Sequence, residues 1–155
     1  MKCLGSNQTL HEALVLSVSS KKKCDERKRE EPYLRLISIQ RSFSVCRVKR
    51  LTSALLNAEY CFTAKTEEEL SLLCPTSCVP LDCEAREDGF WGLKIEGILD
   101  FSLIGILAEL TEILAKEKVG VFVVSTYNTD YIFLKQSEFE RAANALRRAG
   151  HTVGS

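Results

Sequence analysis

A glycine followed by the expected start of a helix is the first candidate for chemistry in this chain. Gly97 lets the backbone turn sharply, and we expect a helix from about Phe101 to Lys118. Free backbone N–H groups at residues 100–103 would attract an anion such as an α-carboxylate. Asp100 or Ser102 would cap the helix, and Asp100 could instead pair with a ligand α-amine. The candidate ligand loop consists of Gly97, Ile98, Leu99, Asp100, Phe101, Ser102 and Gly105.

A polar turn between two apolar runs is the second candidate. Tight hairpin turns usually carry Asn-Gly or Asp-Gly, whereas this turn lacks glycine, although Asn128 tolerates a positive φ. Its hydroxyl and carboxyl groups either fix the turn by hydrogen bonds or line a pocket beside a ligand, and both interpretations stay open. The turn consists of Ser125, Thr126, Tyr127, Asn128, Thr129 and Asp130.

Cysteines and histidines offer little support for a metal site or for catalysis. Cys74, Cys78 and Cys83 form a cluster, but a structural zinc site usually needs four ligands and no histidine lies nearby. The total of seven cysteines is odd, which favours reduced thiols in a cytoplasm over a secreted disulfide framework. His11 and His151 lack a neighbouring nucleophile. Because no hydrolase, P-loop or dinucleotide motif is present either, we expect no enzyme activity, no metal and no cofactor.

Bulk composition is that of a globular protein. The 155 residues are 45% hydrophobic and 27% charged, with 21 basic and 21 acidic side chains. This balance argues against nucleic acid as a partner. No stretch approaches the roughly 18 apolar residues of a membrane span, so we expect no membrane partner and a cytoplasmic location.

The second half of the chain has the clearer pattern of elements. Trp91–Glu96 alternates as a strand, and the expected helix follows. Val121–Val124 is a continuous apolar run typical of a central strand, with Tyr131–Leu134 as its partner. Ser137 and Glu140 predict a capping box for a last helix that ends at a left-handed Gly150, before a short strand at 151–153. The order predicts an α+β, ferredoxin-like βαββα(β) module.

The first half is predicted to be smaller and rich in β-strands. Tyr33–Ile39 and Phe43–Val48 read as one long strand bent at Arg41-Ser42, followed by a short helix at Leu51–Asn57 with Leu51, Leu55 and Leu56 inward. Strands follow at Tyr60–Ala64 and Leu70–Cys74. We therefore divide the chain into a disordered charged tail at 1–31, a first half at 32–75, a linker at 76–88 and a second domain at 89–153.

Three blocks of the second half resemble the ACT domain family, and within it the tandem-ACT proteins related to the CASTOR-type arginine sensors. The blocks are residues 89–97, 99–107 and 124–132, and the Ser-Thr-Tyr-x-Thr-Asp-Tyr run is the most specific of them. A weaker resemblance extends over Tyr33–Cys74, which departs from the pattern because it lacks a full second helix.

The resemblance implies a non-enzymatic regulatory sensor that binds an amino acid where two ACT units meet. The partner would be a second copy of the chain or another ACT-domain protein. It also favours a pocket role for Thr126 and Asp130. The alternative is an interaction or dimerisation module that has kept the fold without the ligand.

Overall fold

The computed structural model describes residues 33–98 and 104–155. The charged segment at 1–31 lies outside the described residues, as do Leu99, Asp100, Phe101 and Ser102 of the candidate ligand loop.

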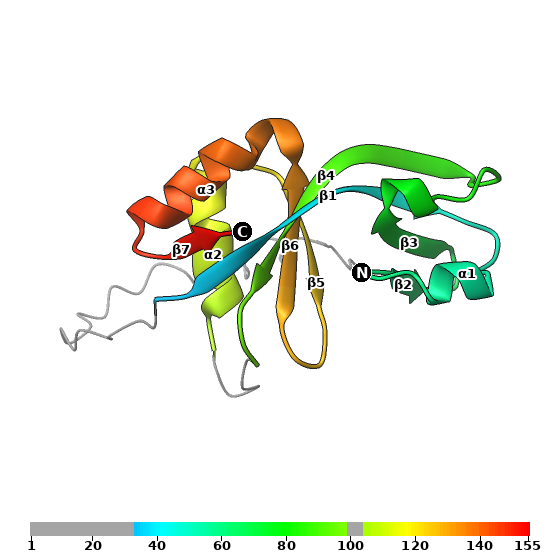
Figure 1. Ribbon diagram of the computed structural model, residues 1–155, viewed down its shortest axis with the longest axis horizontal. Helices are drawn as coiled ribbons and strands as arrows, with labels where there is room; N and C mark the ends of the chain where they lie inside the picture. Colours follow the sequence, from blue (N-terminus) through cyan, green and yellow to red (C-terminus); the bar gives the residue numbers. More distant parts are fainter. Residues whose placement is uncertain (1–32, 99–103) are drawn as a thin grey trace, which may run out of the picture. The chain divides into compact units, whose positions relative to one another are not determined.

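A single seven-stranded sheet carries the described part of the chain (Figure 1). Six strands follow the order β2-β3-β1-β4-β6-β5, with antiparallel neighbours, and β7 pairs in parallel with β1. The strands are β1 (Arg35–Arg47), β2 (Phe62–Lys65), β3 (Leu70–Pro75), β4 (Ala85–Ile95), β5 (Val121–Ser125), β6 (Asp130–Lys135) and β7 (Thr152–Gly154).

Short helices in the first half and longer ones in the second connect the strands. They are α1 (Ser53–Leu56), the 3-10 helix η2 (Thr76–Cys78), α2 (Ile106–Lys116), the 3-10 helix η3 (Gln136–Glu138) and α3 (Phe139–Arg148). Elements β4, α2, β5, β6, α3 and β7 form the βαββαβ series that was predicted for the second half. The α+β, ferredoxin-like prediction is therefore confirmed.

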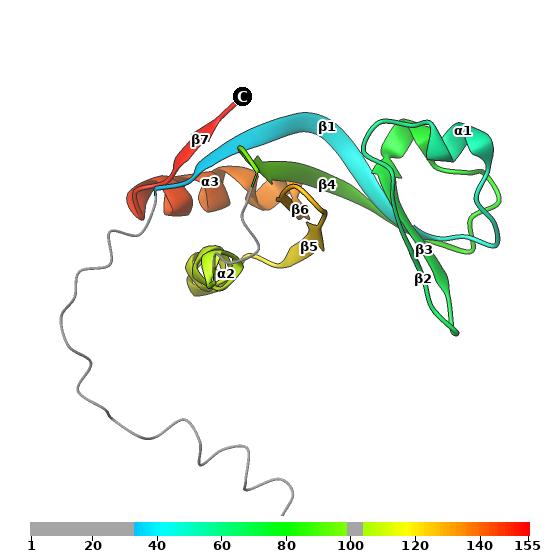
Figure 2. The ribbon, with the colours of Figure 1, turned by 90° about the horizontal axis from the view of Figure 1, so that it is seen from below.

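The first half repeats this series in reduced form. Its elements β1, α1, β2, β3, η2 and β4 also read βαββαβ, but α1 has 4 residues and η2 only 3. Strand β4 belongs to both series, and it pairs with β1 along most of its length. Register shifts between Ile39 and Phe43 and between Phe43 and Val45 mark bulges in β1. The strand bends there (Figure 2), as the sequence predicted at Arg41-Ser42.

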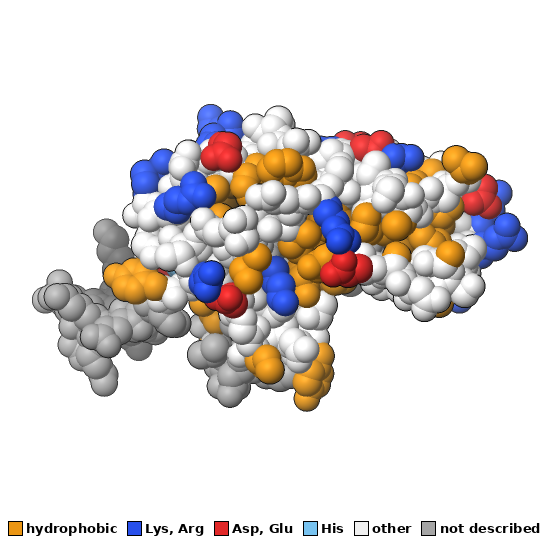
Figure 3. Space-filling view, viewed as in Figure 1, with side chains coloured by type: hydrophobic (Ala, Val, Ile, Leu, Met, Phe, Trp, Pro, Cys, Tyr) orange, Lys and Arg blue, Asp and Glu red, His pale blue; other side chains and the backbone are white. Residues whose placement is uncertain are grey.

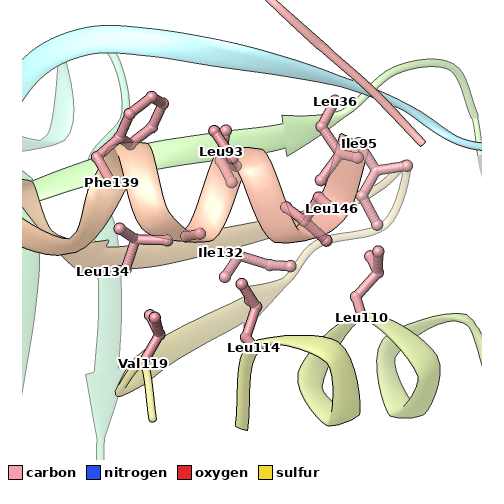
Figure 4. Close-up of a cluster of buried hydrophobic side chains, with 12 residues drawn as sticks. Leu36, Leu93, Ile95, Leu110, Leu114, Val119, Ile132, Leu134, Phe139 and Leu146 are labelled. Atoms are coloured by element: carbon pink, nitrogen blue, oxygen red, sulfur yellow. The ribbon is translucent and has the colours of Figure 1, made fainter. Parts of the chain in front are cut away.

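Three clusters of buried side chains hold the sheet and its helices together. The largest lies between β4, β6, α2 and α3 and includes Leu93, Ile132, Leu110 and Leu146, each without exposed surface (Figure 4). A second cluster surrounds Cys46, Leu55 and Cys74 in the first half. The third is aromatic and joins the halves, with the rings of Phe43 and Phe133 at a centroid distance of 5.0 Å.

Several predicted boundaries are wrong, the most important being the start of the first long helix. Helix α2 begins at Ile106, after Gly105 at φ +96°, so neither Asp100 nor Ser102 is its N-cap. Helix α3 begins at Phe139 without a side-chain cap, because Ser137 lies inside η3. The prediction made for the C-terminal end of α3 is confirmed, since Gly150 has φ +103°.

Three further predictions about strands and burial are wrong as well. Strand β5 is an outer strand of the sheet and not a central one. Strand β4 begins at Ala85, within the segment predicted as a linker. Leu56 points outward with 61% of its surface exposed, whereas Leu55 is buried as expected.

Candidate functional site

Both segments of the candidate site lie at the same end of the sheet. The end of β4, the β5–β6 turn and the first turn of α2 all lie toward this end (Figure 1). Ladder pairing of Lys94 with Tyr131 and of Ser125 with Asp130 fixes the position of the turn relative to β4. Residues that are about 30 positions apart in sequence therefore converge, and Arg35 of β1 also holds this end of β4 through a hydrogen bond from the N–H of Glu96 to its carbonyl.

Thr129 ties the polar turn to the end of β4. It is 3% exposed, and its Oγ1 donates a 2.7 Å hydrogen bond to the carbonyl oxygen of Ile95, two residues before Gly97. Thr126 closes the turn from the other side, because its Oγ1 donates to the carbonyl of Thr129 at 2.7 Å and its backbone N–H donates to the same oxygen at 3.0 Å. The hydrogen bonds thus give both hydroxyls a role in holding the turn.

An equivalent turn in the first half clarifies what these hydroxyls do. Thr66 uses its backbone N–H and its Oγ1 to donate to the carbonyl of Glu69, at 2.9 and 3.4 Å. Its position after β2 matches that of Thr126 after β5. Because the same geometry occurs where the turn residues are glutamates, the Thr126 hydroxyl has a structural purpose independent of any ligand.

Gly97 and Gly105 frame the rest of the candidate loop. Both have positive φ, at +94° and +96°, and a Cβ at either position would meet no described atom within 4 Å. Left-handed backbone, and not crowding, therefore favours glycine at these two positions. Ile98 and Ile104 are 79% and 95% exposed, so the described ends of the loop present apolar side chains to the solvent.

The first turn of α2 offers backbone donors, although five residues later than predicted. The first hydrogen bond of the helix runs from the N–H of Glu109 to the carbonyl of Gly105 at 2.9 Å. The N–H groups of residues 105–108 precede it, and no side chain of the described residues caps the helix. Such an end attracts negative charge.

The remaining turn residues differ in exposure. Tyr127 is 82% exposed, Ser125 and Asn128 are also exposed, and Asp130 is half-buried at the start of β6. The structure therefore places the turn beside the end of β4, two residues before Gly97, with Tyr127 and Asn128 exposed.

His151 is a buried polar residue that the sequence analysis treated as incidental. Its Nδ1 accepts a hydrogen bond from the N–H of Leu34 at 3.3 Å, and its Nε2 lies 3.4 Å from a carboxylate oxygen of Glu109. Glu109 belongs to the first turn of α2. His151 thereby lies between the residue before β1, the first turn of α2 and the start of β7. The sequence signal for its burial was its position between the end of the last helix and the short final strand.

A polar network in the first half was missed as well. Ser44 is fully buried; its hydroxyl contacts the Thr76 hydroxyl at 2.9 Å and donates to the carboxylate of Asp88. Hydrogen bonds from Arg86 and Ser44 lower the pKa of Asp88. The network joins β1, η2 and β4, and its members satisfy one another.

An apolar groove separates the two outer strands, β2 and β5. It has a volume of about 270 Å³ and is lined by Phe62, Leu73, Phe122 and Val124, among others. The Phe62 ring packs against Phe133 and Tyr131 at centroid distances of 5.8 and 5.1 Å. Ser125 lines this groove and also belongs to the candidate site.

Charge and metal-binding groups are dispersed in the described part of the chain. On the face shown in Figure 3, basic and acidic side chains alternate, and apolar atoms are also exposed at the end that carries the β5–β6 turn. Among the described residues, no three His, Cys, Asp or Glu side chains are placed to hold a metal ion. None of the helices described is long and apolar enough to cross a bilayer.

Solved structures provide relatives for this fold. A crystal structure of a protein from Agobacterium tumefaciens is 24% identical, with a TM-score of 0.73, and the match covers 80% of this chain and 95% of that one. A Vibrio cholerae protein of unknown function, described as a possible transport protein, is 20% identical with a TM-score of 0.57, over 74% and 88% of the two chains. The regulatory subunit of aspartate kinase from Thermus thermophilus is 9% identical with a TM-score of 0.56, over 75% and 97%.

Sequence comparison identifies the same fold over a shorter range. No protein with a curated description matches the chain significantly. Residues 85–148 match the family model described as the ACT domain, from the start of β4 to the end of α3. The chain has an ACT-like ferredoxin fold, and its segment 85–148 is the part that is similar to the ACT domain family.

Proposed function

We propose that this chain is a non-enzymatic regulatory sensor that binds an amino acid between two ACT units. The observation that carries the proposal is the convergence of the Gly97 loop, the first turn of α2 and the β5–β6 turn at one end of the sheet. The N–H groups of residues 105–108 would receive the α-carboxylate. Exposed polar groups of the turn would face the rest of the ligand.

The second unit is required because the described half-site is open. Ile98 and Ile104 are exposed beside it, and apolar side chains at such positions are commonly buried against a partner. A second copy of this chain or another ACT-domain protein would complete the pocket. Ligand binding would then regulate the partner by stabilising one association or conformational state over another.

Relatives support the regulatory part of this proposal. The segment 85–148 matches the ACT family, and one structural neighbour is a regulatory subunit of aspartate kinase. A relation to the CASTOR-type arginine sensors and a cytoplasmic location stay predictions.

Isothermal titration calorimetry of the full chain against each of the twenty amino acids tests the proposal. We expect binding of one or a few of them, weakened at least tenfold by Gly97→Val, because valine disfavours the positive φ of this turn. Asp100→Ala tests the adjoining acidic side chain, and we expect this substitution to weaken amino-acid binding as well. Gly120→Ala is the control, since Gly120 lies outside the loop and an added Cβ there would meet no described atom within 4 Å.

Thermal unfolding of each variant separates lost binding from lost folding. If no amino acid binds to the unaltered chain while it self-associates stably, the sensor proposal fails. If Gly97→Val and Asp100→Ala bind the amino acid as tightly as the unaltered chain does, the ligand binds at another site.

A second function, protein interaction without a ligand, is favoured by the exposed apolar side chains themselves. Val121 and Phe122 on the outer strand β5 are 36% and 40% exposed, in addition to Ile98 and Ile104. Outer strands with apolar side chains readily pair with other chains. The same titrations, combined with a measured self-association constant, distinguish this function from ligand sensing.

A further inference from the structure

The five cysteines of the described residues gather around one apolar cluster in the first half. Cys46 of β1 and Cys74 of β3 are buried within it, at 2% and 0% exposure. The remaining three thiols pack against the cluster and are partly exposed; they are Cys61, Cys78 and Cys83. Cysteines that are distant in sequence are thus brought together by the sheet and by the loop before β4.

Cys46 and Cys83 are neighbours in this cluster. Burial, and after it the neighbouring Cys83 thiol, raise the pKa of Cys46. The backbone holds them in place, because the N–H of Glu84 donates to the carbonyl of Arg47 at 2.8 Å and Arg47 pairs with Ala85 in the ladder. A further turn bond from the N–H of Cys83 to the carbonyl of Pro80, at 3.3 Å, fixes the loop that carries Cys83.

The other three thiols are less well placed to form a disulfide. Cys74 has no exposed surface, and burial raises its pKa to about 12, so almost none of it is thiolate at neutral pH. Burial and the neighbouring Cys78 thiol raise the pKa of Cys61, but no backbone hydrogen bond between described residues joins the segments of Cys61 and Cys78. Cys83 therefore combines solvent access with a thiol partner, and Cys46 is that partner.

We propose that Cys46 and Cys83 form a reversible intramolecular disulfide when the chain meets a low-molecular-weight disulfide such as glutathione disulfide. The Cys83 thiolate attacks one sulfur of the small disulfide, whose S–S bond breaks and releases one small thiol. The sulfur of Cys46, after losing its proton to solvent, then attacks Cys83 and releases the second small thiol. Two protein thiols are oxidised, and one small disulfide is reduced to two thiols.

The two steps differ in rate for a structural reason. Cys83 is partly exposed, whereas Cys46 is 2% exposed and burial raises its pKa. The exchange at Cys83 is therefore the faster step, and closure by Cys46 is slower. The completed bond would tie the loop before β4 to the end of β1, and β1 and β4 are neighbouring strands of the sheet. We expect it to raise the midpoint of thermal unfolding.

Mass spectrometry of the full chain after incubation with glutathione disulfide tests the pair directly. Trypsin and a protease that cleaves before aspartate release residues 42–47, which contain Cys46 alone, and residues 82–86, which contain Cys83 alone. The expected product links these two peptides and reverts with dithiothreitol. Cys46→Ser should accumulate a glutathione adduct on Cys83, and Cys83→Ser should leave Cys46 unmodified. Cys61→Ser is the control and should not change the link.

Two results would overturn the proposal. One is a predominant bond between any other cysteines, including Cys61 with Cys78. The other is an unaltered chain that holds a glutathione adduct on Cys83 and never closes the internal bond. Because Cys46 is buried, circular dichroism checks the folding of its variant, and the partly exposed Cys83→Ser supplies the independent arm.

Discussion

Thr129 shows how one hydroxyl connects two parts of the candidate site. Its Oγ1 satisfies the carbonyl of Ile95, so the end of β4 and the β5–β6 turn hold a fixed relation. Thr126 and Thr66 close their turns in the same way, although the residues between differ. Selectivity for a ligand would therefore depend more on exposed residues such as Asn128 than on these threonine hydroxyls.

Replacing Thr129 by valine should destabilise the fold. The change keeps the shape of the side chain but leaves the Ile95 carbonyl without its donor, which costs about 1–3 kcal/mol for a buried group. Chemical denaturation measures the free energy of unfolding. Thr63→Val, at an exposed position of β2, is the control and should change stability by less than about 0.5 kcal/mol. Equal effects of the two substitutions would contradict this role for Thr129.

Helix α1 is short, yet it covers a cluster that includes two buried cysteines. Thr52 caps it by accepting a hydrogen bond from the N–H of Leu55 at 3.4 Å, and Leu55 is 4% exposed while Leu56 is 61% exposed. Four residues cannot form a stable helix alone. The burial of Leu55 therefore anchors α1 to the sheet.

A pair of adjacent substitutions tests this anchor. Leu55→Ala should cost about 2–4 kcal/mol of unfolding free energy, because it removes buried methyl groups and leaves a cavity. Leu56→Ala, with the same chemistry one position later, should cost less than about 1 kcal/mol. Thermal or urea unfolding of both variants gives the comparison. A larger loss for Leu56 would mean that α1 packs with its other face inward.

Hydrophobic periodicity predicted most elements, and its errors have local causes. Leu103 extends the apolar spacing of α2 toward the N-terminus, so the pattern predicted a helix start that is too early. The helix begins only after Gly105, because the positive φ of Gly105 is not helical. Gly105 inside a helical pattern was the missed signal. Ser137 and Glu140 matched a capping box, but a 3-10 turn occupies that position.

The order of the strands in the sheet could not be predicted from the sequence, for a different reason. Val123 packs on the main core and Val124 on the aromatic cluster, so β5 has apolar residues on both sides like a central strand. Its outer position follows from the pairing of β4 with β6 and with β1. Such long-range pairing leaves no local trace, and neither does the convergence of Gly97 with Thr129.

Strands β1 and β4 make the two halves of the fold interdependent. The first part of β1 lies between β7 and β4, and the second part lies between β3 and β4. A perturbation at the cysteine cluster and one at the candidate ligand loop therefore act on opposite ends of the same strand, β4. Strand β4 is therefore a physical connection through which disulfide formation and ligand binding would affect each other.

Exposed isoleucines at the ligand end of β4 give the last prediction, which concerns association. If a second copy covers this end, Ile98→Asp and Ile104→Asp should each raise the dissociation constant of the dimer at least about tenfold, since a charge would replace a buried apolar contact. Analytical ultracentrifugation over a range of concentrations measures the constant. Leu81→Asp is the control, because Leu81 is equally exposed but precedes β4 at the opposite end. All three variants should unfold at the same temperature as the unaltered chain. Equal association of the control and the isoleucine variants would assign the contact to another surface, such as the outer strand β5.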